Sequence, residues 1–117
     1  MVREVLSELI AADPALELVG VATDAQAAIS LASDAAPHVA IVDVRMPGGG
    51  GAFATRGVMD VSPGTKVIAF SGDFDDALAE QLRAAGAVKQ VLKGGPIGSI
   101  LEAIHEAVAA DAPAGTT

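Results

Sequence analysis

Three polar residues of the sequence, an acid, a hydroxyl and an amine, lie at the ends of predicted strands. Asp43 follows one such strand, Ser71 follows the next, and Lys93 follows the last. A carboxylate can attack phosphorus and hold it as an aspartyl phosphate. An amine can neutralise the charge that is added, and a hydroxyl can donate a hydrogen bond to a phosphoryl oxygen. These residue types together indicate a site that handles a phosphoryl group.

Each of these residues alone has a simpler explanation. An Asp at a strand end is most often a turn or cap residue. Ser71 beside Gly72 is most simply the N-cap of a following helix, and Lys93 is most simply a solvated charge. The glycines after Asp43 leave backbone N–H groups able to approach a phosphate, but the Gly49-Gly50 pair is equally explained as a flexible loop.

The spacing of apolar residues predicts the elements that position these side chains. Asp13-Pro14 ends the first helix, Thr23-Asp24 caps the second, and Gly86 closes the fourth. The predicted strands are 16–22, 38–44, 65–71 and 87–93. The predicted helices are 2–12, Ala25 to the residues before Pro37, 52–61, Phe74 to Ala85, and Ile97 to about Ala110.

The alternation of strands and helices predicts an α/β fold, a doubly wound parallel sheet covered on both faces. Sites in such sheets lie at the carboxyl ends of the strands, where the three polar residues would converge. The chain length indicates one domain over residues 1–110, with 111–117 as a flexible tail or the start of a linker.

The charge and composition disfavour several classes of function. With 7 basic and 15 acidic residues the net charge is −8, which disfavours binding to nucleic acid or to an anionic membrane. The absence of cysteine removes disulfides and thiolate metal sites. No apolar run has the ~18 residues of a membrane span, and the N-terminus lacks the form of a signal peptide. We therefore predict a cytoplasmic protein. His38 and His105 are too far apart in the predicted fold to form a metal pair.

Three stretches of the sequence carry a resemblance to a known family. They are "IVDVRMPGGGGAFATR" (41–56), "VIAFSGDFDD" (67–76) and "RAAGAVKQVLKGG" (83–95). In this order and spacing they resemble the receiver domain of two-component response regulators, over almost the whole chain.

The resemblance implies a flavodoxin-like fold and a role in phosphorelay signalling. It implies that Asp43 accepts phosphate from a histidine kinase or a small acyl phosphate. It implies also that Ser71 and Lys93 sense the phosphate, and that the backbone carbonyl of Arg45 and the Asp43 carboxylate are ligands of Mg²⁺.

Three departures from the family pattern predict weakened switching, and one of them is the Gly49-Gly50 pair, where acidic or larger residues are common in the family. The family's first strand ends in an acidic pair that holds magnesium, and we expect both to be absent here, so that Mg²⁺ binding and phosphotransfer are impaired. Gln90 stands at the switch position, where the family usually carries Tyr or Phe. The alternative hypothesis is therefore a degenerate receiver that acts as a phosphorylation-independent interaction module.

The missing strand would lie at the centre of the family's sheet, which leaves about four strands and five helices. Its loss would open two strand edges, between 16–22 and 38–44. We predict either that these strands pair directly in a rearranged sheet, or that a homodimer forms through the exposed sheet edges or the last helices.

The sequence gives little support to a third hypothesis, a small hydrolase or phosphatase with Asp43 as its nucleophile. The Asp-x-Asp pair typical of small phosphatases is Asp43-Val44-Arg45 here. No Gly-Lys-Ser/Thr follows the glycine run, so it is not a Walker loop. We predict that the chain is not an enzyme.

Overall fold

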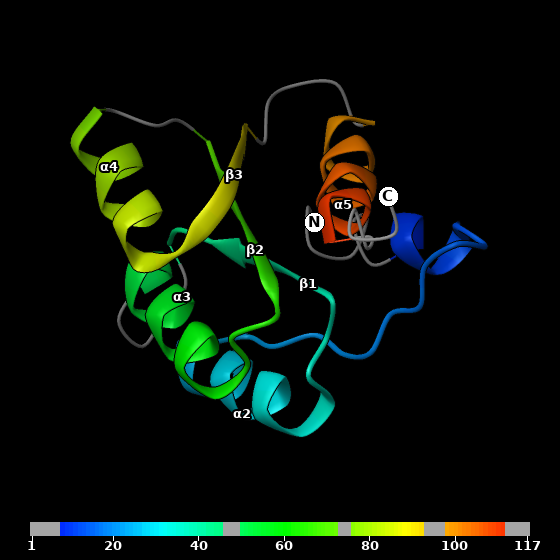
Figure 1. Ribbon diagram of the computed structural model, residues 1–117, viewed down its shortest axis with the longest axis horizontal. Helices are drawn as coiled ribbons and strands as arrows, with labels where there is room; N and C mark the ends of the chain where they lie inside the picture. Colours follow the sequence, from blue (N-terminus) through cyan, green and yellow to red (C-terminus); the bar gives the residue numbers. More distant parts are fainter. Residues whose placement is uncertain (1–7, 46–49, 73–75, 93–97, 112–117) are drawn as a thin grey trace.

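The computed structural model describes residues 8–45, 50–72, 76–92 and 98–111, and these form a three-stranded parallel sheet with helices on both faces (Figure 1). The strands are β1 (Val39–Asp43), β2 (Lys66–Ser71) and β3 (Ala87–Leu92). They lie in chain order, with β2 in the middle. Five of the six residues of β2 are buried because it is covered on both faces and has a neighbour on each side.

Helices pack against the sheet in two layers. They are α2 (Ala25–Ala35), α3 (Gly50–Val61), α4 (Asp76–Ala85) and α5 (Ser99–Asp111), and residues 8–12 are also helical. Helices α2, α3 and α4 cover one face, and α5 covers the other (Figure 1). Each layer has its own apolar cluster: Val58, Val67 and Leu82 belong to the first, and Ile68 and Ile104 to the second. The predicted α/β fold class is confirmed.

Local capping follows the sequence. The Asp24 side chain accepts a hydrogen bond from the Ala27 N–H at 2.7 Å and so caps α2, as predicted. Gly86 follows α4 with φ +122°, and its N–H donates to the Leu82 carbonyl at 3.2 Å. A side chain at this φ would be strained, which explains the glycine.

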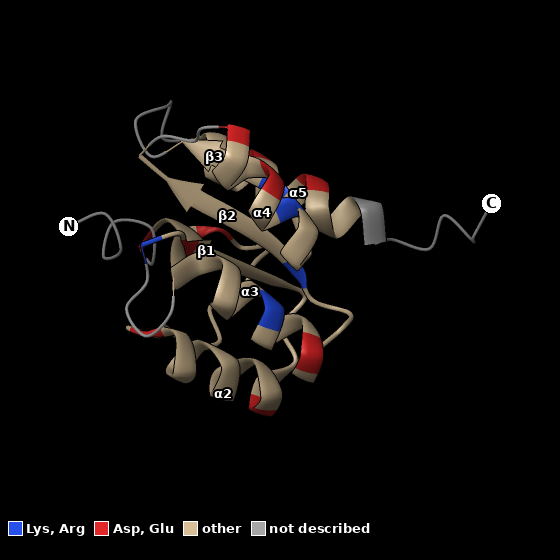
Figure 2. Cartoon of the chain, turned by 90° about the vertical axis from the view of Figure 1, so that its left-hand side faces the viewer, with Lys and Arg blue, Asp and Glu red and all other residues tan. Residues whose placement is uncertain are grey.

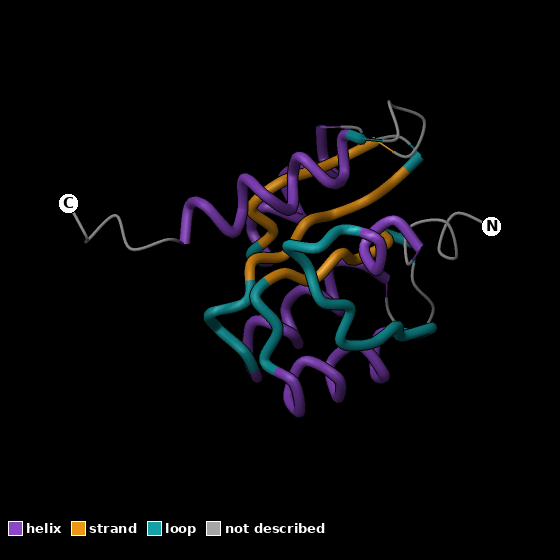
Figure 3. Tube along the Cα trace, turned by 90° about the vertical axis from the view of Figure 1, so that its right-hand side faces the viewer, coloured by secondary structure: helices purple, strands orange, loops and turns teal. Residues whose placement is uncertain are grey.

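The predicted strand at 16–22 is wrong. Among the described residues, 13–24 contain neither helix nor strand (Figure 3). Residues 16–22 do not join the sheet, so the predicted direct pairing with 38–44 is also wrong, and the described sheet has three strands rather than four. A β-rich segment becomes a strand only when a neighbouring edge satisfies its backbone groups. Here Leu18, Val19 and Val21 are left exposed instead.

Both ends of the chain extend beyond the described part. Of the predicted helix 2–12, residues 8–12 are helical and 2–7 lie outside the described residues. Helix α5 ends at Asp111, one residue into the predicted tail, and 112–117 lie outside the described residues.

One buried hydroxyl is paired and another is not. The Thr65 hydroxyl donates to the Pro37 carbonyl at 2.7 Å and is also 2.7 Å from the Ser62 hydroxyl, which joins the turn before β2 to the approach to β1. The Thr55 hydroxyl in α3 is fully buried and has no hydrogen-bond partner among the described residues. A buried polar group without a partner lowers stability.

We therefore expect Thr55→Val to raise the free energy of unfolding by about 1 kcal/mol, because it replaces an unpaired hydroxyl with a methyl group of similar size. Urea denaturation checks this. The matched control, Thr65→Val, should lower stability by about 1–3 kcal/mol because it leaves its polar partners unpaired. Equal effects of the two substitutions would contradict the prediction.

A side-chain contact joins Asp13, which follows the helical residues 8–12, to α5. Asp13 Oδ2 lies 2.8 Å from His105 Nε2, and Asp13 Oδ1 accepts from the Ala15 N–H at 2.9 Å. The Ala15 hydrogen bond and then the His105 hydrogen bond hold the pKa of Asp13 below its usual value of 3.8. The folded chain thus favours the ionised carboxylate.

This depressed pKa gives the stability of the chain a dependence on pH. The contribution of Asp13 is fully present above about pH 3.8 and is lost as the pH falls through the lower folded pKa. As the pH is lowered from above 3.8 through the folded pKa of Asp13, the free energy of unfolding should fall less in Asp13→Asn than in the wild type. Urea unfolding at stepped pH values measures this, with Asp34→Asn on α2 as the control. A wild-type pH dependence in Asp13→Asn would contradict the assignment.

Candidate functional site

Asp43 is the last residue of β1, at the carboxyl edge of the sheet. The side chain is half-buried, and its Oδ1 accepts a hydrogen bond from the Arg45 N–H at 2.9 Å. The turn interpretation of Asp43 therefore holds for one carboxylate oxygen. This bond fixes the carboxylate over the start of the loop that leads to α3.

Ser71 is the last residue of β2 and is 1% exposed. The strand register pairs Asp43 with Phe70, so Asp43 and Ser71 are one register position apart on neighbouring strands. The interpretation of Ser71 as an N-cap is wrong, because Ser71 is the last residue of β2 and the next residue, Gly72, is not helical. The hydroxyl and the carboxylate thus end adjacent strands at one edge, as expected.

The third predicted residue, Lys93, lies outside the described residues. The register nevertheless pairs Ser71 with Leu92, the residue that precedes Lys93 in the chain. The end of β3 therefore reaches the same edge of the sheet as the ends of β1 and β2.

The glycine run after Asp43 has a packing role that the sequence did not predict. Gly51 begins the buried side of α3, and its N–H donates to the Val44 carbonyl at 2.9 Å. A Cβ at Gly51 would lie 2.6 Å from the Val44 Cα, which no side chain allows. The N–H of Gly51 is therefore used by the fold. Gly48 and Gly49 lie outside the described residues.

Gln90 lies in the middle of β3 and is half-buried. Its side-chain Nε2 donates to the Ala79 carbonyl of α4 at 3.0 Å. The amide thus makes a polar link between β3 and α4, which an aromatic ring could not make.

A magnesium site is not completed by the described residues. Among them no three His, Asp or Glu side chains gather in one place. Magnesium requires near-octahedral oxygen ligands. Of the predicted ligands, the described residues include Asp43 and Arg45.

A family model of the response regulator receiver domain matches residues 1–105. The chain belongs to this family. It is a receiver domain of two-component signal transduction, and the resemblance seen in the sequence is confirmed.

Relatives of this receiver domain include whole response regulators. The chain is 32% identical over 105 residues to the response regulator GacA of Pseudomonas protegens, covering 90% of this chain and 49% of that protein. It is 38% identical over 90 residues to a protein-glutamate methylesterase/protein-glutamine glutaminase of Geobacter metallireducens, covering 74% of this chain and 26% of that one. The receiver domain therefore spans about half or less of the length of these relatives.

Solved structures share the architecture of this receiver domain. The signal receiver domain of the response regulator NarL from Mycobacterium tuberculosis is 29% identical, with a TM-score of 0.86, and the match covers 92% of this chain and 87% of that one. No helix in the described part of the receiver domain is long and apolar enough to cross a membrane.

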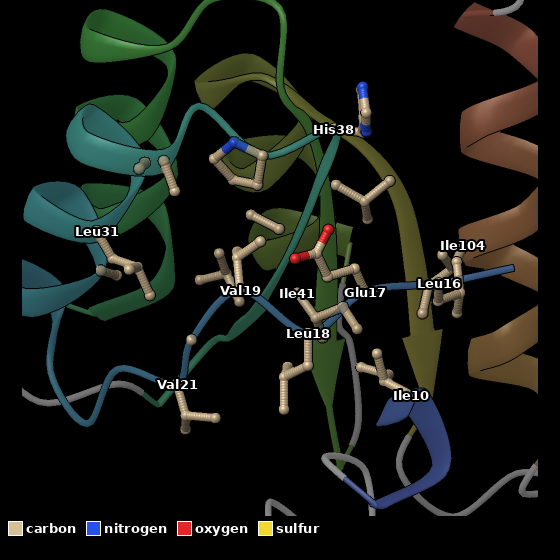
Figure 4. Close-up of a pocket in the computed structure, with 18 of the residues that line it drawn as sticks. Ile10, Leu16, Glu17, Leu18, Val19, Val21, Leu31, His38, Ile41 and Ile104 are labelled. Carbon is tan, nitrogen blue, oxygen red and sulfur yellow. The ribbon is translucent and has the colours of Figure 1, made fainter. Parts of the chain in front are cut away.

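A groove lies beside β1 of this receiver domain, and the sequence did not predict which residues would line it. It has a volume of about 800 Å³ and lies between residues 16–22 and β1 (Figure 4). Both His38 and His105 line it. We call it the β1 groove. The sequence predicted open strand edges between 16–22 and 38–44. It could not predict which residues surround them, because that depends on how the helices pack on the two faces of the sheet.

Proposed function

We propose that Asp43 is a phospho-acceptor in two-component signalling, with a histidine kinase or a small acyl phosphate as the donor. The observation that supports this is the placement of Asp43 and Ser71 at the ends of adjacent parallel strands, in a chain that belongs to the receiver family. In the reaction, a carboxylate oxygen of Asp43 attacks phosphorus. The new P–O bond forms as the bond from phosphorus to the donor nitrogen or oxygen breaks, and the donor keeps that electron pair.

In this proposal Ser71 and Lys93 act on the product. The Ser71 hydroxyl donates to a phosphoryl oxygen, and Lys93 offsets the added negative charge. The added charge matters because the chain is already strongly acidic, at −8, and the Lys and Arg residues of its described part lie on different elements (Figure 2). Repulsion from that acidity disfavours both a phosphoryl group and a nucleic-acid partner.

Phosphotransfer to Asp43 is expected to be slow. Magnesium would use Asp43 and the Arg45 carbonyl, and it would neutralise phosphoryl charge, but the described residues do not complete its shell. The weak metal site and a cytoplasmic location are parts of the same proposal.

A second candidate is a phosphorylation-independent interaction module. The hydrogen bond from Gln90 to the Ala79 carbonyl favours it, because it ties β3 to α4 without any phosphate. In that case partner binding persists in Asp43→Ala. A homodimer through the sheet edges or the last helices remains a prediction for either function.

Intact-mass spectrometry after incubation with acetyl phosphate and Mg²⁺ separates the two candidates. A phosphate-sized gain on the wild type, lost in Asp43→Ala and kept in the surface control Asp60→Ala, supports the phospho-acceptor. No gain on the wild type, even at long incubation, overturns it in favour of the interaction module. Ser71→Ala and Lys93→Ala then test the sensing roles through the lifetime of the added phosphate.

A further inference from the structure

Helix α4 is packed unevenly along its length. Its buried residues, Leu82 and Ala85, both lie in its second half. Gly86 closes that half, because its N–H donates to the carbonyls of Leu82 and Arg83 at 3.2 and 3.0 Å. A helix of ten residues is marginal in water unless tertiary packing supports it. The second half of α4 therefore has the support that the helix needs.

The first half of α4, residues 76–81, has much less support. Four of its six residues are exposed. Leu78 packs against the first apolar cluster but is only partly buried. The ion pair between Glu80 and Arg83, at 2.8 Å, joins side chains that are 67% and 63% exposed, so it adds little stability. Segments with few buried apolar contacts open locally at a low free energy.

The side chain of Gln90 joins this weakly packed half to the sheet. Its Nε2 donates to the Ala79 carbonyl at 3.0 Å. Lys89, the preceding residue of β3, faces the other layer, where its Nζ lies 2.7 Å from Glu106 Oε1 of α5. Strand β3 is itself paired with β2 from Ala87 to its end, so the donor belongs to a well-supported element.

We propose that Gln90 is a latch, whose side-chain amide holds the first half of α4 against β3, and that this half opens locally about the fixed second half when the bond breaks. Opening would uncover the side of β3 that faces α4, where Leu92 is already 51% exposed. The latch thus sets how often that side of β3 is uncovered. The inference goes beyond both candidate functions and requires no phosphate on Asp43.

Amide hydrogen exchange of the full chain, resolved by NMR, tests the latch. In a helix the N–H groups of Glu80 and Gln81 bond to carbonyls of the first turn, so they report on opening of the first half. The slowest amides of β2 report on global unfolding. In the wild type, Glu80 and Gln81 should exchange about tenfold faster than those β2 amides, or more.

Gln90→Met keeps the length of the side chain but removes the donor. The Glu80 amide should then exchange about fivefold faster than in the wild type, the effect of losing one hydrogen bond. The matched control, Gln81→Met, changes an exposed residue of the same half and should leave the Glu80 rate unchanged.

Ile68→Val separates local opening from global unfolding. Ile68 lies in the cluster beneath α5, on the other face of the sheet from α4. Its packing is the same whether the first half of α4 is open or closed, so the substitution should speed exchange in β2 about fivefold and leave Glu80 and Gln81 unchanged.

Three results would overturn the proposal. The first is equal protection of Glu80 and β2 in the wild type, which would mean that α4 opens only with the whole fold. The second is an unchanged Glu80 rate in a folded Gln90→Met. The third is faster Glu80 exchange in Ile68→Val. The first and third require no substitution at Gln90, so they decide the matter even if that variant does not fold.

Discussion

Replacing Ile68 with alanine should lower the free energy of unfolding by about 2–5 kcal/mol. Ile68 is at the centre of β2, is 0% exposed, and belongs to the cluster beneath α5. Removing its branched side chain loses apolar burial and leaves a cavity that the paired strands on both sides of β2 cannot close. Urea denaturation monitored by circular dichroism measures the loss.

Two controls separate this cavity effect from general disturbance of the sheet. Ile68→Val removes one methylene group and should cost only about 0.5–1.5 kcal/mol. Val88→Ala on β3 changes a residue that is 53% exposed, and should stay within about 0.5 kcal/mol of the wild type. A loss in Val88→Ala as large as that in Ile68→Ala would contradict the described core.

Replacing Gly51 with alanine should lower stability by about 1–3 kcal/mol. The new Cβ would lie 2.6 Å from the Val44 Cα and 3.2 Å from the Asp43 carbonyl oxygen. These are backbone atoms, so no side-chain rotation relieves the contact. Helix α3 must then move away from the end of β1, which also shifts the turn that holds the Asp43 carboxylate.

Gly64→Ala is the matched control for this substitution. Gly64 lies in the turn before β2, does not have a left-handed φ, and has no atom within 4 Å of an added Cβ. It should be neutral or raise stability by up to about 1 kcal/mol. If the two alanine variants unfold at the same urea concentration, the close approach at Gly51 is wrong.

The strands that the sequence predicted correctly are those with neighbours. The runs 38–44, 65–71 and 87–93 match β1, β2 and β3 to within one residue at each end, because each run is rich in Val and other apolar residues and is bounded by turn residues. The run 16–22 has the same β-rich composition but no hydrogen-bonded neighbour in the described sheet. Composition alone cannot supply that neighbour, so the prediction failed there.

In the candidate site, too, some features could be predicted from the sequence and others could not. The positions of Asp43 and Ser71 at strand ends followed from the ends of apolar runs. The packing of Gly51 against Val44 did not, because close approach between elements depends on how α3 docks and leaves no local signal beyond the glycine itself. The link from Gln90 to α4 was missed for the same reason.

The order of the strands also bears on how the chain folds. Because β1, β2 and β3 lie side by side in the order of synthesis, each new strand pairs with the one made just before it, across a single helix. Such pairings keep the contact order low for a parallel sheet, which favours rapid folding. The sheet can therefore grow strand by strand during translation, before α5 is complete and covers its second face.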